Sequence, residues 1–162
     1  MIRDDSRRFF TRLRGSRGAT LVEAALITPL LMLLTFSIVD FGSIFYVYLS
    51  LENGVSQATR YGITGNVMLD INGNQMSRTD SIMTAMRNAT PTLTLPDNAF
   101  TFSYLSPGSS TWSSGAGGPD DIQKVTVDYT WTVMTPLIAA FFPGGTIHFT
   151  VESSMKDEPK FQ

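Results

Sequence analysis

The sequence of 162 residues contains no cysteine and only one histidine, His148. The lack of cysteine excludes disulfide bonds, thiolate nucleophiles and metal sites with Cys ligands. The sequence also lacks the Gly-x-Ser-x-Gly, His-Glu-x-x-His and Walker motifs. His148 stands between threonines with no adjacent acid, so we interpret it as an exposed or edge histidine of a strand. We therefore expect no enzyme, no catalytic residue, no metal and no cofactor.

Basic residues are scarce beyond the first eighteen positions. Residues 1–18 contain six arginines and two aspartates, whereas the remainder contains six basic and twelve acidic residues. An acidic body of this kind argues against a nucleic-acid partner, which would require Lys and Arg spread over the folded surface. The short basic arm is instead typical of a membrane-orientation signal.

Charge is missing altogether from the sixteen residues 24–39, and apolar and aromatic residues resume after Asp40. The hydrocarbon core of a bilayer takes roughly 20 helical residues, so residues 24 to about 46 predict one transmembrane helix. Arginines precede this segment and none follows before Arg60, which predicts that residues 1–18 are cytoplasmic and that the chain after about residue 50 lies outside. Pro29 lacks an amide donor and predicts a local kink or an opening of the backbone hydrogen-bond ladder.

Residues 18–23, GATLVE, join the basic arm to this apolar segment. A secretory signal peptide would end in a small-residue cleavage site, which is absent here. The stretch instead resembles the cleavage motif of type IV prepilins, in which a basic leader ends in Gly and Glu stands fifth in the mature chain. After such a cut, the Ala19 amine and the Glu23 carboxylate would lie one helical turn apart and neutralise each other, or Glu23 would reach a neighbouring subunit's amine. Without the motif, Glu23 would be an interfacial carboxylate favoured by the helix dipole.

A family resemblance rests on residues 17–33, RGATLVEAALITPLLML, together with residues 40–42, DFG. This pattern resembles TadE-like pseudopilins, the minor pilin-like subunits of the tight adherence (Flp) pilus, over residues 17 to about 60. The resemblance implies these roles: Gly18 before the cut, Ala19 as mature first residue, Glu23 in processing and assembly, and Pro29 as helix proline. We assign Asp40 and Gly42 to helix packing or kinking, with Asp40 either contacting a partner or marking where the helix leaves the lipid.

The resemblance also implies a location and partners. It places the chain in the bacterial inner membrane, with the amino terminus cytoplasmic and the carboxyl-terminal domain periplasmic, in or at the tip of a pilus after assembly. The implied partners are a prepilin peptidase, other pilin-like subunits and the pilus assembly platform. The alternative is a membrane-anchored extracytoplasmic binding or adhesion module that does not join a pilus.

The predicted fold class is α+β and pilin-like, divided into a leader (1–18), a transmembrane helix (19–50) and an outer domain (51–162). The outer domain begins with a helical continuation to about residue 65 and a short helix from Ser77 to near Asn88. Residues 99–105, 122–133 and 146–152 alternate apolar and polar side chains. They predict an antiparallel sheet of three or more strands, with the helices on one face.

Two segments of the outer domain remain open to more than one interpretation. The loop 106–121 is rich in Gly and Ser; its Trp112 either anchors a contact or, as we prefer, folds over the sheet edge. Asp120 and Asp121 lack the spacing of a calcium loop. Residues 136–145 contain six consecutive apolar side chains, which either plug the core, as we prefer, or form a tip that touches membrane or partner subunits.

Overall fold

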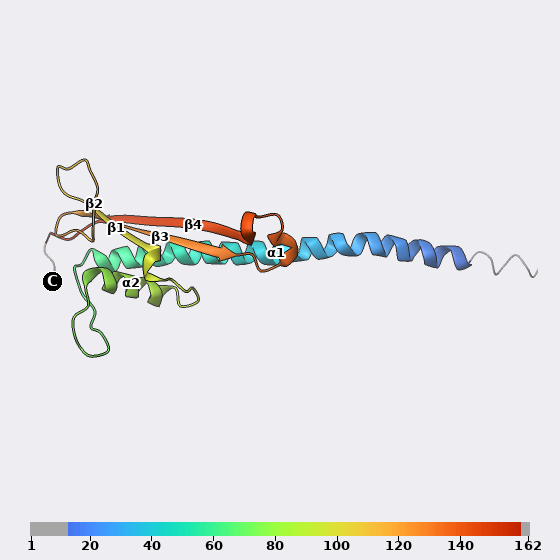
Figure 1. The fold of residues 1–162 in the computed structure, drawn as a ribbon, viewed down its shortest axis with the longest axis horizontal. Helices are drawn as coiled ribbons and strands as arrows, with labels where there is room; N and C mark the ends of the chain where they lie inside the picture. Colours follow the sequence, from blue (N-terminus) through green and yellow to red (C-terminus); the bar gives the residue numbers. More distant parts are fainter. Residues whose placement is uncertain (1–12, 160–162) are drawn as a thin grey trace, which may run out of the picture.

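The computed structural model of the chain describes residues 13–159, with side chains from residue 18 onward. Most of the predicted leader therefore lies outside the described residues. One helix, α1 (Leu13–Gly62), runs the length of the molecule. Figure 1 shows that the outer domain packs along its second half, while its first half projects as a bare rod. The predicted membrane segment and the predicted helical continuation are thus one uninterrupted element.

The second half of α1 forms the spine of the hydrophobic core. Val47, Leu51, Val55 and Ala58 recur at spacings of three and four residues, and all are buried. The helix ends at Gly62, and in the turn that follows Gly65 adopts a positive φ of 69°, a backbone conformation that glycine adopts without a steric penalty.

The second helix, α2 (Arg78–Ala89), begins as the sequence predicts. Ser77 caps it, because its side-chain oxygen accepts a hydrogen bond from the Asp80 amide at 3.0 Å. The helix buries Ile82, Met83 and Met86 in the core that it shares with α1. The two helices approach closely at Gly54, where an added Cβ would lie 2.5 Å from the Thr90 side chain.

A single antiparallel sheet covers one side of α1, in the order β2-β1-β3-β4. Its strands are β1 (Phe100–Leu105), β2 (Ser113–Ser114), β3 (Ile122–Thr132) and β4 (Thr146–Lys156), and a short 3-10 turn, η1 (Asp97–Ala99), precedes β1. The α+β prediction is confirmed. The strand β4 continues four residues beyond its predicted end, because its eleven residues pair with all eleven of β3.

The two faces of the sheet differ as the alternation predicts. Val125, Val127, Trp131 and Val151 are buried in the core formed with α1 and α2. The intervening positions, among them Asp128 and Thr150, face solvent. His148 is exposed on this polar face, with its Nδ1 atom 2.9 Å from the Thr130 hydroxyl. Trp112 is partly exposed, and the Lys124 ammonium lies 4.4 Å from the centre of its ring, above β3.

The connection between β3 and β4 contains a four-residue helix, α3 (Pro136–Ala139), and a 3-10 turn, η2 (Pro143–Gly145). It forms the end of the outer domain nearest the bare part of α1 (Figure 1). Ile138, Ala139 and Phe142 pack partly against the core, whereas Leu137 and Phe141 are 49% and 72% exposed. The preferred interpretation as a core plug is therefore correct for only one of the segment's two faces.

Candidate functional site

The bare part of α1 contains most of the functional residues that the sequence predicts. Residues 18–39 are exposed almost throughout, and Glu23 is their single formal charge. At 1.5 Å per residue these 22 residues measure about 33 Å, close to the ~30 Å hydrocarbon core of a bilayer. Among the described residues, one helix is long and apolar enough to cross a membrane, and it is this one.

The hydroxyl groups in this part of α1 are satisfied within the helix. Thr28, Thr35 and Ser37 donate to the carbonyl oxygens of Ala24, Leu31 and Leu33, at 2.7, 2.9 and 2.7 Å. Each bond links residues four apart along the helix. Because lipid offers no hydrogen-bond partners, these bonds would let the three hydroxyl groups lie within a bilayer.

The predicted cleavage motif lies at the start of the described side chains. Gly18 and Ala19 are both exposed on α1, and Glu23 is exposed one turn further on. A Cβ added to Gly18 would meet nothing within 4 Å, so no packing within the chain requires glycine there. Among the residues that the structure describes, packing therefore gives no reason for glycine at this position.

Pro29 lies inside α1, which is helical on both sides of it. The proline lacks an amide hydrogen and cannot donate to the carbonyl four residues earlier. Figure 1 shows that the helix continues past this position without a break. The predicted local opening of the hydrogen-bond ladder thus does not interrupt the rod.

Asp40 is the first residue of α1 that the outer domain covers, and it is 1% exposed. Its Oδ1 atom accepts a hydrogen bond from the Met134 amide at 3.2 Å. Its Oδ2 atom is buried without a hydrogen-bond partner among the described residues. In this structure Asp40 contacts its own chain, and it fastens α1 to the end of β3.

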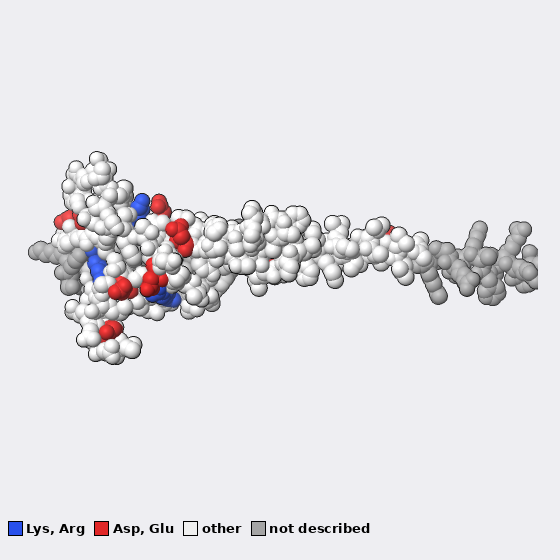
Figure 2. All heavy atoms as spheres, viewed as in Figure 1, with Lys and Arg blue, Asp and Glu red and all other residues white. Residues whose placement is uncertain are grey.

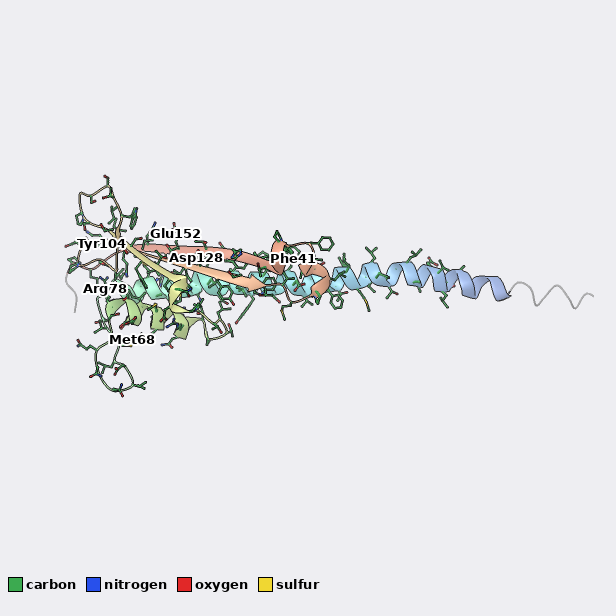
Figure 3. The ribbon with its side chains drawn as sticks, viewed as in Figure 1. Phe41, Met68, Arg78, Tyr104, Asp128 and Glu152 are labelled. Atoms are coloured by element: carbon green, nitrogen blue, oxygen red, sulfur yellow. The ribbon has the colours of Figure 1, made fainter. Side chains whose placement is uncertain are left out.

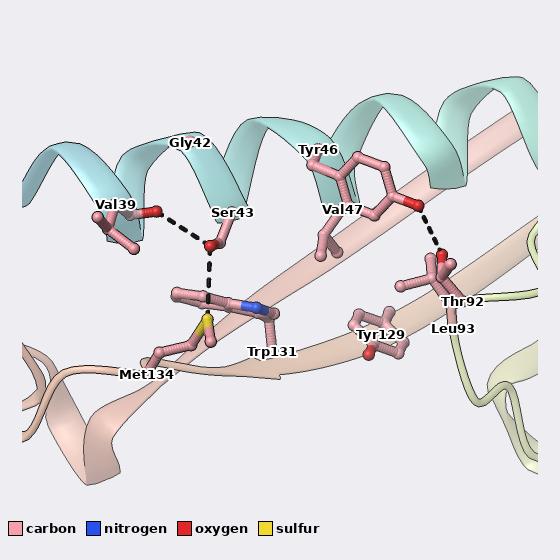
Figure 4. Close-up of a pocket in the computed structure, with 10 residues that line it drawn as sticks. All are labelled: Val39, Gly42, Ser43, Tyr46, Val47, Thr92, Leu93, Tyr129, Trp131 and Met134. Carbon is pink, nitrogen blue, oxygen red and sulfur yellow. Dashed lines mark hydrogen bonds between the residues drawn. The ribbon is translucent and has the colours of Figure 1, made fainter.

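Gly42, two residues after Asp40, lines a groove of about 510 Å³ between α1, β3 and the segment that follows α2. Figure 4 shows the indole of Trp131 and the ring of Tyr129 facing α1 across this groove. Tyr46 and Thr92 close one end with a hydroxyl pair at 2.8 Å, and Ser43 donates to the Met134 sulfur at 3.4 Å. A Cβ on Gly42 would have no neighbour within 4 Å, so this side of α1 is open.

The opposite end of the outer domain is held by Arg78, which sequence reasoning missed. Its guanidinium donates to the Gly62 carbonyl at 2.9 Å, the Gly117 carbonyl at 2.6 Å and Asp157 Oδ2 at 2.8 Å. It thereby joins the end of α1, the loop before β3 and the residue after β4. One signal was available: a cation in the first turn of α2 opposes the helix dipole and needs another reason to be there.

The Asp157 carboxylate is buried beside this guanidinium. Burial raises the pKa of Asp157 above its ordinary value of 3.8, although the hydrogen bond and the charge of Arg78 lower it. The nearby Asp121 carboxylate adds to the rise. Nothing in this cluster provides a nucleophile or a set of metal ligands, so its arrangement serves to close the domain.

Comparison with known families bears on the bare helix. The family model described as TadE-like protein matches residues 18–60. The amino-terminal helix is TadE-like. The match begins at Gly18 and ends two residues before the end of α1, so the TadE-like region includes Glu23, Pro29, Asp40 and Gly42. This confirms the resemblance seen in the sequence. The chain is thus similar to TadE-like proteins over this helix.

Neither a curated protein nor a solved structure matches the chain. The sheet and α2 lie outside the TadE-like region, and their description rests on the structure itself. The similarity and the bare surface coincide on residues 18–39, which makes this part of α1 the candidate functional site.

Proposed function

We propose that the chain is a minor pseudopilin of a tight adherence (Flp) pilus, cut by a prepilin peptidase between Gly18 and Ala19. In this proposal α1 resides in the bacterial inner membrane, with the arginine-rich leader in the cytoplasm and the outer domain in the periplasm. The observation that carries the proposal is that the TadE-like match starts at Gly18, the residue that would precede the cut.

The bare helix supports a role in packing against other subunits. A simple anchor needs only apolar side chains, whereas this one carries Glu23 at the edge of the uncharged segment. A carboxylate in that position is costly unless it is paired. The new amine of Ala19, in the same chain or in a neighbouring pilin-like subunit, would provide the pair, because residues i and i+4 share a helix face.

Processing is tested by sequencing the mature amino terminus in cells with and without a prepilin peptidase. The expected mature chain begins at Ala19 only when the peptidase is present. Gly18→Ala should keep the leader attached, and Gly42→Ala is the matched control, because both glycines have empty space where a Cβ would be added. Normal shortening of the Gly18→Ala variant, or a cut elsewhere, would contradict the proposal.

Assembly is tested by co-purification with the other pilin-like subunits and the assembly platform. Glu23→Val should insert into the membrane as the wild type does but recover less of these partners. Thr35→Val is the control, since Thr35 is also exposed and its hydroxyl bonds only within the helix in this structure. Equal recovery by both variants would favour a membrane-anchored adhesion module that does not join a pilus.

A further inference from the structure

The half of the outer domain nearest the bare helix carries no exposed formal charge. Residues 129–151 contain no Asp, Glu, Lys or Arg, and residues 24–51 of α1 contain only Asp40, which is buried. Figure 2 shows the consequence in that view: acidic and basic atoms gather at the far end of the domain, and the zone that joins the domain to the rod is white. Soluble surfaces usually mix both signs of charge, so a wide uncharged zone needs an explanation.

The length of α1 places this zone relative to a bilayer. If the hydrocarbon begins just after Glu23, roughly 20 helical residues take it to about Ser43. Met134 contacts α1 at that level, through the Asp40 carboxylate at 3.2 Å and the Ser43 hydroxyl at 3.4 Å. The segment that follows, with α3 and η2, therefore lies at the level of the outer headgroups and not in open water.

The exposed side chains at this level are those that an interfacial layer favours. Met134, Leu137 and Phe141 of the β3–β4 connection are 67%, 49% and 72% exposed. Phe41 and Phe45, which follow Asp40 in α1, are also exposed. Transfer of such side chains from water into an apolar layer is favourable. Aromatic residues gather at membrane surfaces for this reason.

We propose that residues 134–145, hereafter the proximal tip, insert into the outer leaflet as a second membrane contact beside α1. The partner is the lipid bilayer, because the level set by α1 and the missing charge both fit a lipid surface without any specific headgroup. Two contacts on one side of the domain fix its tilt and depth, which a single helix leaves free. The inference depends on α1 spanning the membrane, but it does not depend on leader cleavage or pilus assembly.

The lack of cysteine makes the test direct. Single cysteines are introduced into the full chain at Leu137 and Phe141, with Leu31 as a lipid control and exposed Ser154 of β4 as a water control. Each is labelled with a nitroxide, and the chain is reconstituted into liposomes at a low protein-to-lipid ratio. Power saturation then compares collisions with oxygen, which concentrates in lipid, and with a water-soluble nickel chelate.

The labels at Leu137 and Phe141 are expected to show a several-fold lower nickel-to-oxygen ratio than the label at Ser154, approaching that at Leu31. Adding Phe141→Asp should move the Leu137 label toward the value for water while leaving Leu31 unchanged. Nickel-to-oxygen ratios at Leu137 and Phe141 equal to that at Ser154, with the Leu31 label still in lipid, would contradict membrane insertion of the proximal tip. Shielding that appears only at high protein density would also overturn it, because a second copy would then be the partner.

Discussion

The two ends of the outer domain are closed by different interactions. At the far end, Arg78 joins three parts of the chain through two carbonyl groups and the buried Asp157 carboxylate. At the end near the bare helix, the Asp40–Met134 hydrogen bond and partly buried apolar side chains join α1 to the end of β3. The two ends of one domain thus suit two surroundings. Charged side chains lie at the end that water surrounds, and exposed charge is absent from the end where α1 enters the proposed membrane.

The glycines of α1 follow the same division. A Cβ on Gly54 or Gly62 would collide with side chains of the domain, whereas one on Gly18 or Gly42 would meet nothing within 4 Å. The glycines in the domain half permit close packing within the chain. Gly18 on the bare part of α1 and Gly42 at the open groove leave surface available to something outside the chain.

The largest effect should come from removing the tie at the far end. Arg78→Met leaves the Asp157 carboxylate buried without its cation, and losing one member of a buried pair costs about 3–5 kcal/mol. Denaturant unfolding of the full chain in detergent, followed by near-ultraviolet circular dichroism, measures this. The control is Lys124→Met, because the Lys124–Glu152 pair spans 3.8 Å at the surface and should be worth less than about 1 kcal/mol. Equal losses would show that the buried Arg78–Asp157 pair contributes no more to stability than a surface pair.

A smaller effect is expected where α1 and α2 meet. Gly54→Ala places a methyl group 2.5 Å from the Thr90 side chain and should destabilise the domain by about 1–3 kcal/mol. Gly42→Ala, in the same helix but at the open groove, should leave stability unchanged or raise it by up to ~1 kcal/mol through helix propensity. The same unfolding measurement applies, and a loss with Gly42→Ala would show that its side of α1 is packed.

Asp40 sharpens the comparison at the other end. Asp40→Ala leaves the Met134 amide without its acceptor but also removes a buried carboxylate oxygen that lacks a partner. These effects oppose each other, so the net loss should be about 1 kcal/mol. Asp40→Asn keeps an acceptor and should lose less than the alanine variant in the same assay. A loss as large as that of Arg78→Met would mean that both ends depend on ionic ties.

The smallest effect is a pH dependence set by Asp157. Since the folded protein raises the pKa of Asp157, it binds that proton more tightly than the unfolded chain does, and the contribution favours folding at low pH. As the pH rises from about 3.8 through the raised pKa, wild type should lose stability relative to Asp157→Asn. Denaturation midpoints of both proteins across this window measure the difference. A rise in the stability of wild type relative to Asp157→Asn with increasing pH would show that folding lowers the pKa of Asp157 instead.

The helices and long strands were predictable because each repeats a local pattern. The spacing of Val55 and Ala58 in α1, the Ser77 cap and the alternation in β3 all follow from residues close in sequence. The strand β2 was missed because two serines in a Gly-rich loop carry no pattern. The processing motif was also read from residues close in sequence, and its role stays a prediction.

The ties at the two ends were not predictable from local patterns. Arg78 and Asp157 are 79 positions apart, and Asp40 and Met134 are 94 apart. No period or spacing connects such residues, because their proximity results from how the sheet lies along α1. The position of Arg78 at the start of a helix was the one local signal. A cation there opposes the helix dipole, which suggests a pairing elsewhere but does not identify Asp157 as the partner.

The continuity of α1 has a mechanical consequence. Its 50 residues extend for about 75 Å, and the residues that hold the domain core, such as Leu51 and Val55, sit on the same helix as Glu23. No flexible linker interrupts the helix between them, so a force or torque applied at the membrane end is transmitted to the outer domain. The outer domain must therefore move together with the bare part of α1 whenever that part is displaced.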